Sequence, residues 1–187
     1  MNKIVLAQIF GLLGAISMLL SSWQKTRNKV LTFLILDSIF YLIEYIILGA
    51  LSGAFINVVS IIRTIIFKYK DKNKIFQSNI ILLLILLLYI LVGVFTYNGL
   101  ISIFPVVASI LYAIVLWQDN VKKIRLGSAI MILSFLIYNI AVGAYLSILV
   151  ELVLLISSIT AIIKLDILNA KEKNLVQTNW QNVKTVI

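Results

Sequence analysis

Long apolar stretches alternate with short polar connections along almost the whole chain. A helix needs about 20 predominantly apolar residues to cross a bilayer, and seven stretches approach that length. The predicted spans are 4–20, 30–49, 53–68, 78–96, 100–117, 124–142 and 145–164. No ten-residue segment alternates apolar and polar positions as a barrel strand does, so helices are the expected spanning elements. The pattern predicts an all-α membrane protein with seven transmembrane helices.

The composition excludes most soluble classes. Apolar residues make up 62% of the chain and charged residues only 12%, whereas soluble domains average about 45–50% and about 25%. The net charge of +9 lies mostly in the connections, so we read it as a sign of topology and expect no nucleic-acid partner. The chain contains neither Cys nor His, which removes disulfides and the usual ligands of zinc and haem. We therefore expect no cofactor and no metal site.

Basic residues occupy alternate connections. The first, third and fifth connections and the C-terminal tail contain Lys25, Arg27, Lys29, Lys68, Lys70, Lys72, Lys74, Lys122, Lys123, Arg125, Lys164, Lys171, Lys173 and Lys184. The second, fourth and sixth connections contain no Lys or Arg. Because Lys and Arg mark cytoplasmic loops, we predict an N-terminus outside and a C-terminus inside. A signal peptide is the alternative for the first span, although residues 21–25 offer no small-x-small cleavage site.

The chain also matches itself when it is shifted by 94 residues without a gap. Trp23 and Gln24 fall on Trp117 and Gln118, and residues 49–50 fall on the identical pair 143–144. These matches are informative because each lies at the same end of the corresponding helix.

The match predicts two parallel three-helix repeats, because a fourth helix between them restores the starting side of the membrane. We assign residues 1–75 to the first repeat, 76–98 to a linker helix, 99–165 to the second repeat and 166–187 to a polar cytoplasmic tail. Parallel repeats are a transporter plan with the site between the halves. Duplication of a stable scaffold without transport is the alternative.

Several short motifs carry a resemblance to a known family. They are Gln8-Ile9-Phe10-Gly11, Leu48-Gly49, Ile62-Arg63-Thr64, and Glu151 with Lys164 thirteen residues later. With the predicted layout, they make the chain similar to bacterial inner-membrane proteins of the YgjV type. That family is placed here within the SWEET superfamily, also called MtN3/PQ-loop. The resemblance implies a 3+1+3 bundle and a transport function.

The superfamily's Pro-Gln pair is absent. Pro105 occupies a suitable place, but Val106 follows it, and Gly11 is its repeat mate. The resemblance makes Gly11 and Pro105 the hinge candidates.

Four ionisable residues fall inside the predicted spans and away from the span ends: Asp37, Glu44, Arg63 and Glu151. Such residues cost several kcal/mol unless they are paired or hydrated, so they are functional candidates. At 1.5 Å per residue, Asp37 and Arg63 each lie about 10 Å from the cytoplasmic end of their helix. We predict an ion pair between them, which either joins the second and third spans or acts as a gate.

A second group of polar residues lies farther from the cytoplasmic end of the predicted helices. Glu44, Asn57 and Glu151 lie about 17–21 Å from the cytoplasmic end. Asn57 and Glu151 are repeat mates, as are Glu44 and Tyr138. SWEET-like proteins carry a substrate-contacting Asn in the third and seventh spans, and Asn57 matches that residue type. The predicted substrate-binding residues are these four and Asn139, with Glu44 and Glu151 as proton-coupling candidates. Interhelical hydrogen bonding alone is the alternative.

The sequence therefore predicts a small secondary transporter or facilitator of the bacterial inner membrane. It would move a small polar solute by alternating access, and its partners would be the lipid bilayer and that solute. A non-transporting receptor, immunity factor or scaffold is the alternative. We expect no catalytic residues and no enzyme, because Asp37 and Glu44 are about 10 Å apart along one helix, too far to share a proton. No P-loop is present, so ATP is not expected to drive transport.

Overall fold

The computed structural model describes residues 3–49, 51–97, 99–142 and 145–168, and it is helical throughout these ranges apart from short connections. The helices are α1 (Lys3–Ser22), α2 (Arg27–Leu48), α3 (Leu51–Lys68), α4 (Asn79–Phe95), α5 (Ile103–Trp117), α6 (Val121–Val142) and α7 (Tyr145–Ala161). Two 3-10 turns, η1 (Lys70–Lys72) and η2 (Leu100–Ser102), precede α4 and α5, and a π-helical segment, η3 (Ile162–Leu168), continues α7. The all-helical fold with seven α-helices is confirmed over the described residues.

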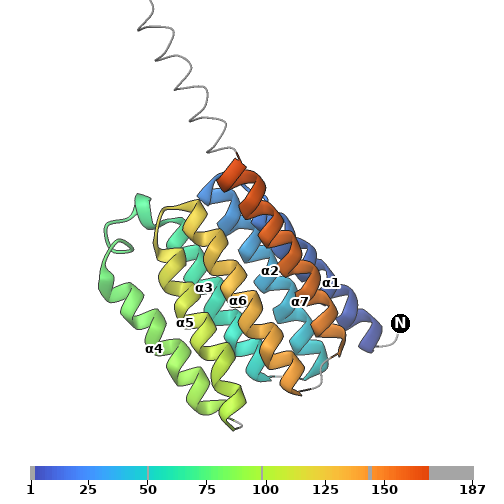
Figure 1. The fold of residues 1–187 in the computed structure, drawn as a ribbon. Coiled ribbons are helices and arrows are strands. Elements are labelled where there is room, and N and C mark those ends of the chain that lie inside the picture. Colours follow the sequence, from blue (N-terminus) through green and yellow to red (C-terminus); the bar gives the residue numbers. More distant parts are fainter. Residues whose placement is uncertain (1–2, 50, 98, 143–144, 169–187) are drawn as a thin grey trace, which may run out of the picture.

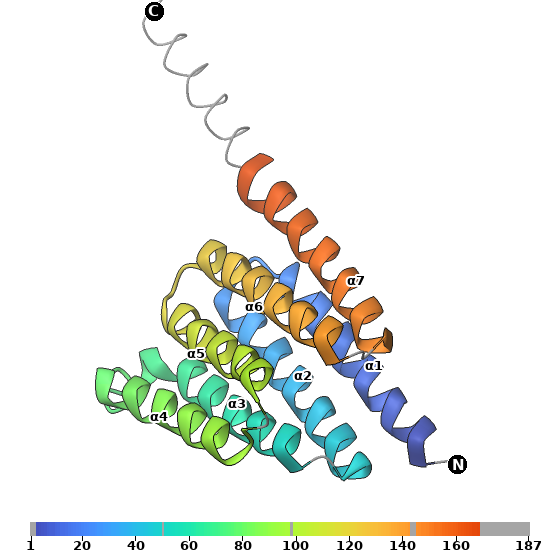
Figure 2. The same ribbon diagram turned by 60° about the horizontal axis from the view of Figure 1, so that its bottom comes forward.

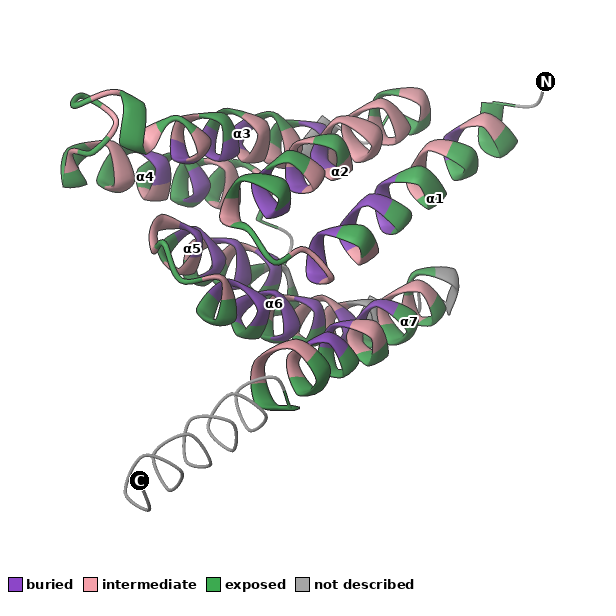
Figure 3. Ribbon diagram, turned by 90° about the horizontal axis from the view of Figure 1, so that it is seen from above, coloured by how far each residue is buried: buried purple, intermediate pink, exposed green. Residues whose placement is uncertain are grey.

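The outer surface of the bundle is apolar. The helices α1 and α2 and the segment Ser147–Leu168 are each long and apolar enough to cross a membrane, and α4 and α5 are shorter apolar helices. On α4 only Ile85 and Tyr89 are buried, while most of its other side chains are exposed. Figure 3 shows exposed positions along the outside of every helix. A surface of this kind is stable against lipid and would aggregate in water.

The helices form two groups that face each other. Consecutive helices pack together from α1 to α3 and again from α5 to α7. The two groups meet where α1 contacts α7 and where α3 contacts α5, and α4 lies outside them against α3 and α5 (Figures 1 and 2).

The two ends of the bundle differ in charge. The connections α1–α2, α3–α4 and α5–α6 and the segment η3 lie at the same end, and the start of α1 lies at the other (Figure 1). We call the first the basic end, because these connections and the adjoining helix ends carry Lys25, Arg27, Lys29, Lys68, Lys70, Lys72, Lys74, Lys122, Lys123 and Arg125. The ends of α2, α4 and α6 and the starts of α3, α5 and α7 lie at the opposite end (Figure 1). The spatial grouping of the basic connections agrees with the alternation of charge in the sequence.

The helix boundaries follow the predicted spans within a few residues, with two notable differences. The helix α5 begins at Ile103 rather than at residue 100, because η2 precedes it. The last helix continues as η3 to Leu168, into the predicted tail, where Asp166 pairs with Arg125 of α6. The rest of that tail lies outside the described residues.

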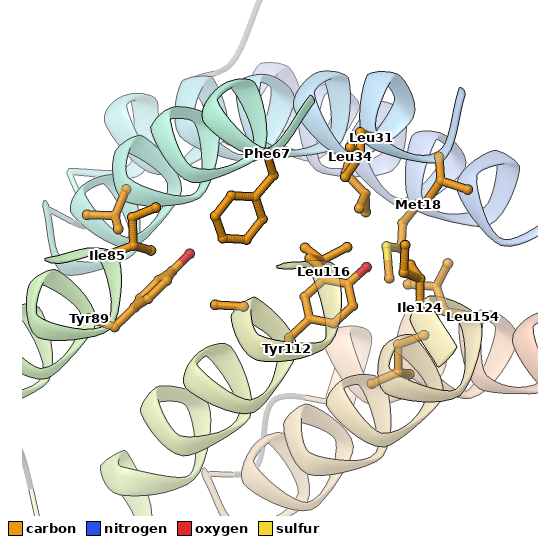
Figure 4. Packing of buried hydrophobic residues seen from close by; sticks show 14 residues of the cluster. Met18, Leu31, Leu34, Phe67, Ile85, Tyr89, Tyr112, Leu116, Ile124 and Leu154 are labelled. Atoms are coloured by element: carbon orange, nitrogen blue, oxygen red, sulfur yellow. The ribbon is translucent and has the colours of Figure 1, made fainter. Parts of the chain in front are cut away.

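The apolar core lies toward the basic end. Met18, Leu31, Phe67, Leu116 and Ile124 are at most 3% exposed, and each lies within about two turns of that end of its helix. Figure 4 shows these side chains converging from both helix groups. Serines at positions 17, 21 and 22 are also buried on α1, and small residues let helix backbones approach closely. The close packing of the two groups is therefore concentrated at one end.

Candidate functional site

Arginine and lysine side chains join the two helix groups at the basic end. Arg27, the first residue of α2, donates from Nη2 to the Leu116 carbonyl at 3.3 Å, and its Nε lies 3.4 Å from Asp119. Lys70 of η1 donates from Nζ to the Trp117 carbonyl at 2.8 Å and lies 3.7 Å from the same carboxylate. Both cations thus satisfy carbonyls that the end of α5 leaves without an intrahelical partner.

The second helix group makes the corresponding contact with α1. The buried Arg125 of α6 donates from Nε to the Ser22 carbonyl at 3.0 Å, and it also pairs with Asp166 of η3. Nearby, the Trp23 indole donates to Ser157 Oγ of α7 at 3.0 Å. Each group therefore uses an arginine to cap the helix end of the other group, and the basic end is closed.

Arg63 lies deeper in the bundle and is 4% exposed. Its Nη1 donates to the Tyr89 hydroxyl of α4 at 2.8 Å. Its Cζ lies 5.7 Å from the centre of the Tyr89 ring and 5.5 Å from that of Tyr112 on α5. The two tyrosine hydroxyls pair in turn with Ser60 and Ser128, each at 2.8 Å. The guanidinium is thus held by aromatic residues of two neighbouring helices.

Arg63 does not form the predicted ion pair with Asp37. Among the described residues, Asp37 and Arg63 form no ion pair within 4.0 Å. Asp37 Oδ1 and Arg63 Nε are both buried without a hydrogen-bond partner. The Asp37 carboxyl still interacts electrostatically with Arg63 and with Glu151. The two residues therefore share a region of the bundle, but Arg63 bonds to Tyr89 because its side chain turns toward α4.

Three acidic or tyrosine side chains of α2 lie against glycines. A Cβ added to Gly11 of α1 would stand 2.5 Å from Glu44 Oε1. A Cβ on Gly14 would stand 2.9 Å from the ring of Tyr41, and one on Gly53 of α3 would stand 2.8 Å from that of Tyr45. The glycines thus make room for these side chains between helices. Gly11, the predicted hinge, forms the surface on which the Glu44 carboxylate rests.

The predicted binding residues of different helices come within electrostatic reach of one another. Tyr45 interacts with Glu44, Glu151 and Tyr138, so α2, α6 and α7 all contribute to this region. The carboxylates of Glu44 and Glu151 are half-buried, and neither has a hydrogen bond or ion pair with a described residue. We call Tyr41, Glu44, Tyr45, Tyr138 and Glu151 the acidic-tyrosine cluster.

The remaining candidates are Asn57, Asn139 and Pro105. The amide of Asn57 donates to the Gly53 carbonyl at 2.9 Å, one turn earlier on its own helix. The side chain of Asn139 lies outside the described residues. Pro105 is buried in the first turn of α5, where a proline removes an N–H that has no helical partner in any case. Its place at a helix start differs from that of a hinge within a continuous helix.

Tyr41 and Tyr45 of the cluster, and Tyr89 beside Arg63, were not predicted as site residues from the sequence. Tyr45 lies 94 residues before Asn139, as Glu44 lies 94 before Tyr138. Because Asn139 is a predicted binding residue, the internal match could have indicated its repeat mate Tyr45 as well. Tyr89, which binds Arg63, gave no signal because it lies in the linker helix outside the internal match. Among the described residues, no three acidic side chains gather as a metal ion would require.

Comparison with known proteins gives one match. No curated protein and no solved structure matches the chain. The model of the Imp-YgjV family, described as a bacterial inner membrane protein, matches residues 5–168. That range includes α1 from its third residue and all of α2 to α7 and η3. The chain therefore belongs to the Imp-YgjV family of bacterial inner membrane proteins.

Proposed function

We propose that this protein is a small secondary transporter or facilitator of the inner membrane, which moves a small polar solute by alternating access. In this proposal residues 1–75 and 99–165 are parallel repeats of a SWEET-like 3+1+3 bundle, and α4 links them. The acidic-tyrosine cluster is the solute site.

The contrast between the closed basic end and the unpartnered carboxylates carries the proposal. Trp23 and Ser157 join the two groups about 9 Å, or six residues, from Glu151 toward the basic end. Glu44 and Glu151 lie beyond this closure without partners. A transporter that faces one side of the membrane needs this combination of a bonded end and a polar site that is ready to bind.

The reciprocal arginine caps support the parallel repeats. Arg27 of the first group binds the end of α5, and Arg125 of the second binds the end of α1. The ends of α1 and α5 are also the places where Trp23 and Trp117 coincide in the internal match. The two accepting residues, Ser22 and Leu116, are 94 residues apart and therefore equivalent in the internal match, as expected for copies related by an axis through the bundle. The two donors are not equivalent, because the same shift sets Arg27 on Val121 and Arg125 on Leu31.

The orientation that we propose places the basic end in the cytoplasm. The chain has no native Cys, so single cysteines report their own position. An impermeant thiol reagent added to intact cells should label Gly99→Cys and leave Lys72→Cys and Lys122→Cys unlabelled until the membrane is opened. Labelling of Lys72→Cys from outside would show that the protein has the opposite orientation.

Glu151→Gln tests the transport function. This change keeps the size of the side chain and removes a charge that can bind a cationic group or carry a proton between the two sides. We expect reconstituted vesicles with the parent protein to take up at least one member of a panel of small polar solutes. The variant should lose that uptake, or the dependence of uptake on a pH gradient.

The matched control is Glu172→Gln, which removes one carboxylate from the predicted polar tail. It should transport like the parent. Equal uptake by the parent and Glu151→Gln at acid and neutral pH would remove Glu151 from the mechanism.

A static receptor or scaffold is the second candidate, and the extent of bonding at the basic end favours it. Alternating access requires the Arg27, Lys70, Arg125 and Trp23 contacts to break in each cycle. Binding of a solute without uptake of any panel member would support this second candidate.

A further inference from the structure

A pocket at the basic end lies outside the proposed transport site. It encloses about 230 Å³ between the start of α2 and the end of α3. The residues that line it are Asn28, Lys29, Thr32, Lys68, Tyr69 and Lys72. Three of these six are lysines, and none is acidic.

The charge of this pocket is uncompensated, unlike the charge elsewhere at the basic end. Arg27, Lys70 and Arg125 all pair with aspartates. Among the described residues, no carboxylate lies within 4.0 Å of the ammonium groups of Lys29, Lys68 or Lys72. The positive end of the α2 helix dipole adds to the same potential. The pocket is therefore suited to an anion.

One lysine is held in place by hydrogen bonds. The Thr32 hydroxyl donates to the Asn28 carbonyl at 2.7 Å, which leaves its oxygen to accept from Lys68 Nζ at 2.8 Å. Lys72 Nζ lies 5.7 Å from the centre of the Tyr69 ring. The pocket thus combines one positioned ammonium with two more exposed ones.

An apolar surface continues from the pocket along α3. Phe55, Val58, Ile62 and Ile65 are all exposed, and their spacing of three or four residues puts them on the helix face that ends at Tyr69. Leu36, one turn after Thr32 on α2, is exposed as well. A molecule that is anionic at one end and apolar at the other matches both parts of this surface.

We propose that this pocket binds the headgroup phosphate of an anionic phospholipid of the cytoplasmic leaflet, with the acyl chains along the exposed faces of α2 and α3. Pockets for drug-sized molecules measure about 300–1,000 Å³, so a volume of about 230 Å³ suits a phosphate and its glycerol alone. Basic pockets between helices on this side of a membrane bind acidic lipid headgroups. The proposal does not depend on transport.

The test measures lipid binding to the purified full-length chain in a nonionic detergent. Native mass spectrometry counts bound phosphatidylglycerol and phosphatidylcholine for the parent and for the double variant Lys29→Gln/Lys72→Gln. Each lysine near an acidic lipid contributes about fivefold in affinity. We expect the variant to bind phosphatidylglycerol about 25-fold more weakly and phosphatidylcholine unchanged.

Two further variants separate the pocket from the general charge of the basic end. Lys25→Gln/Lys123→Gln removes two charges at the same end but outside the pocket, and it should bind phosphatidylglycerol like the parent. Lys29→Arg/Lys72→Arg keeps the charge, and it should retain binding. An equal loss in the Lys25/Lys123 variant would overturn the proposal in favour of a diffuse electrostatic attraction.

The same assay distinguishes a lipid from a soluble anion. Inorganic phosphate or glycerol phosphate at millimolar concentration should not displace phosphatidylglycerol, because neither can use the apolar faces of α2 and α3. Full displacement by either compound would show that the pocket is a site for soluble phosphates and would overturn the lipid assignment.

Discussion

The two ends of this bundle differ in how their charged side chains are bonded. At the basic end, Arg27, Lys70 and Arg125 pair with aspartates and cap helix ends. Toward the opposite end, the carboxylates of Glu44 and Glu151 lie within the bundle without a bonded partner among the described residues. The comparison indicates that stabilising polar contacts are concentrated at the basic end, whereas the carboxylates without bonded partners lie toward the opposite end.

The physical reason lies in what each end must satisfy. A helix leaves its last four carbonyl groups without intrahelical partners. Burial of such carbonyls between helices costs free energy unless donors reach them, and cations at a helix C-terminus also interact favourably with its dipole. Arg27 and Lys70 supply those donors to α5, and Arg125 supplies them to α1. No comparable requirement explains the position of Glu44 or Glu151.

The largest expected effect comes from Arg125→Gln. Its loss leaves Asp166, whose side chain is 10% exposed, as a buried charge without its cation. Removal of one member of a buried pair typically costs about 3–5 kcal/mol. We expect thermal unfolding of the purified protein to occur at a clearly lower temperature.

The control is Lys123→Gln, two residues earlier on the same helix and exposed to solvent. It should unfold like the parent, and Arg125→Gln/Asp166→Asn should recover part of the lost stability. An unchanged unfolding temperature for Arg125→Gln would mean that the basic end does not stabilise the bundle.

An intermediate effect is expected at the other region, from Gly11→Ala. The added Cβ would stand 2.5 Å from Glu44 Oε1, so the carboxylate or the two helices must move. Overpacking typically costs about 1–3 kcal/mol. We expect the low end of that range, because the contacted atoms are the far end of the flexible Glu44 side chain, which can move more easily than backbone. Thermal unfolding should show a loss smaller than that of Arg125→Gln.

A double variant identifies the cause. Glu44→Ala removes the carboxylate that the new methyl group meets, so Gly11→Ala should cost little in that background. If Gly11→Ala is equally destabilising with and without the Glu44 carboxylate, Gly11 is required for close packing of the helices and not for contact with Glu44.

The sequence predicted the helices well because lipid imposes a length and a composition on each of them. All seven predicted spans correspond to helices, and the basic connections gather at one end. The position of Asp166 was harder to predict, since a charged residue after an apolar run is typical of a solvated tail. Its partner, Arg125, lies 41 residues away, and no local pattern links the two.

The polar partners inside the bundle were less predictable than the helices. Helical rise gave Asp37 and Arg63 a common depth, but depth alone does not set the direction of a side chain. The spans are apolar on nearly all faces, so the sequence contains little information on how each helix is rotated about its axis. Arg63 therefore bonds to Tyr89 of α4 at 2.8 Å, a contact that neither the predicted depth nor the internal match indicated.

The smallest effect is expected from Asp119→Asn. This variant separates the ion pairs of the basic end from its helix caps. The side chain of Asp119 is 66% exposed, and it meets Arg27 at 3.4 Å and Lys70 at 3.7 Å. Exposed ion pairs contribute about 0–1 kcal/mol and are screened by salt. The variant should unfold slightly below the parent at low ionic strength and level with it in about 1 M salt. Because Arg27 and Lys70 also bind the carbonyls of Leu116 and Trp117, the caps should persist without the carboxylate. A loss as large as that of Arg125→Gln, or one that salt does not reduce, would show that Asp119 orders both cations and that the caps depend on it.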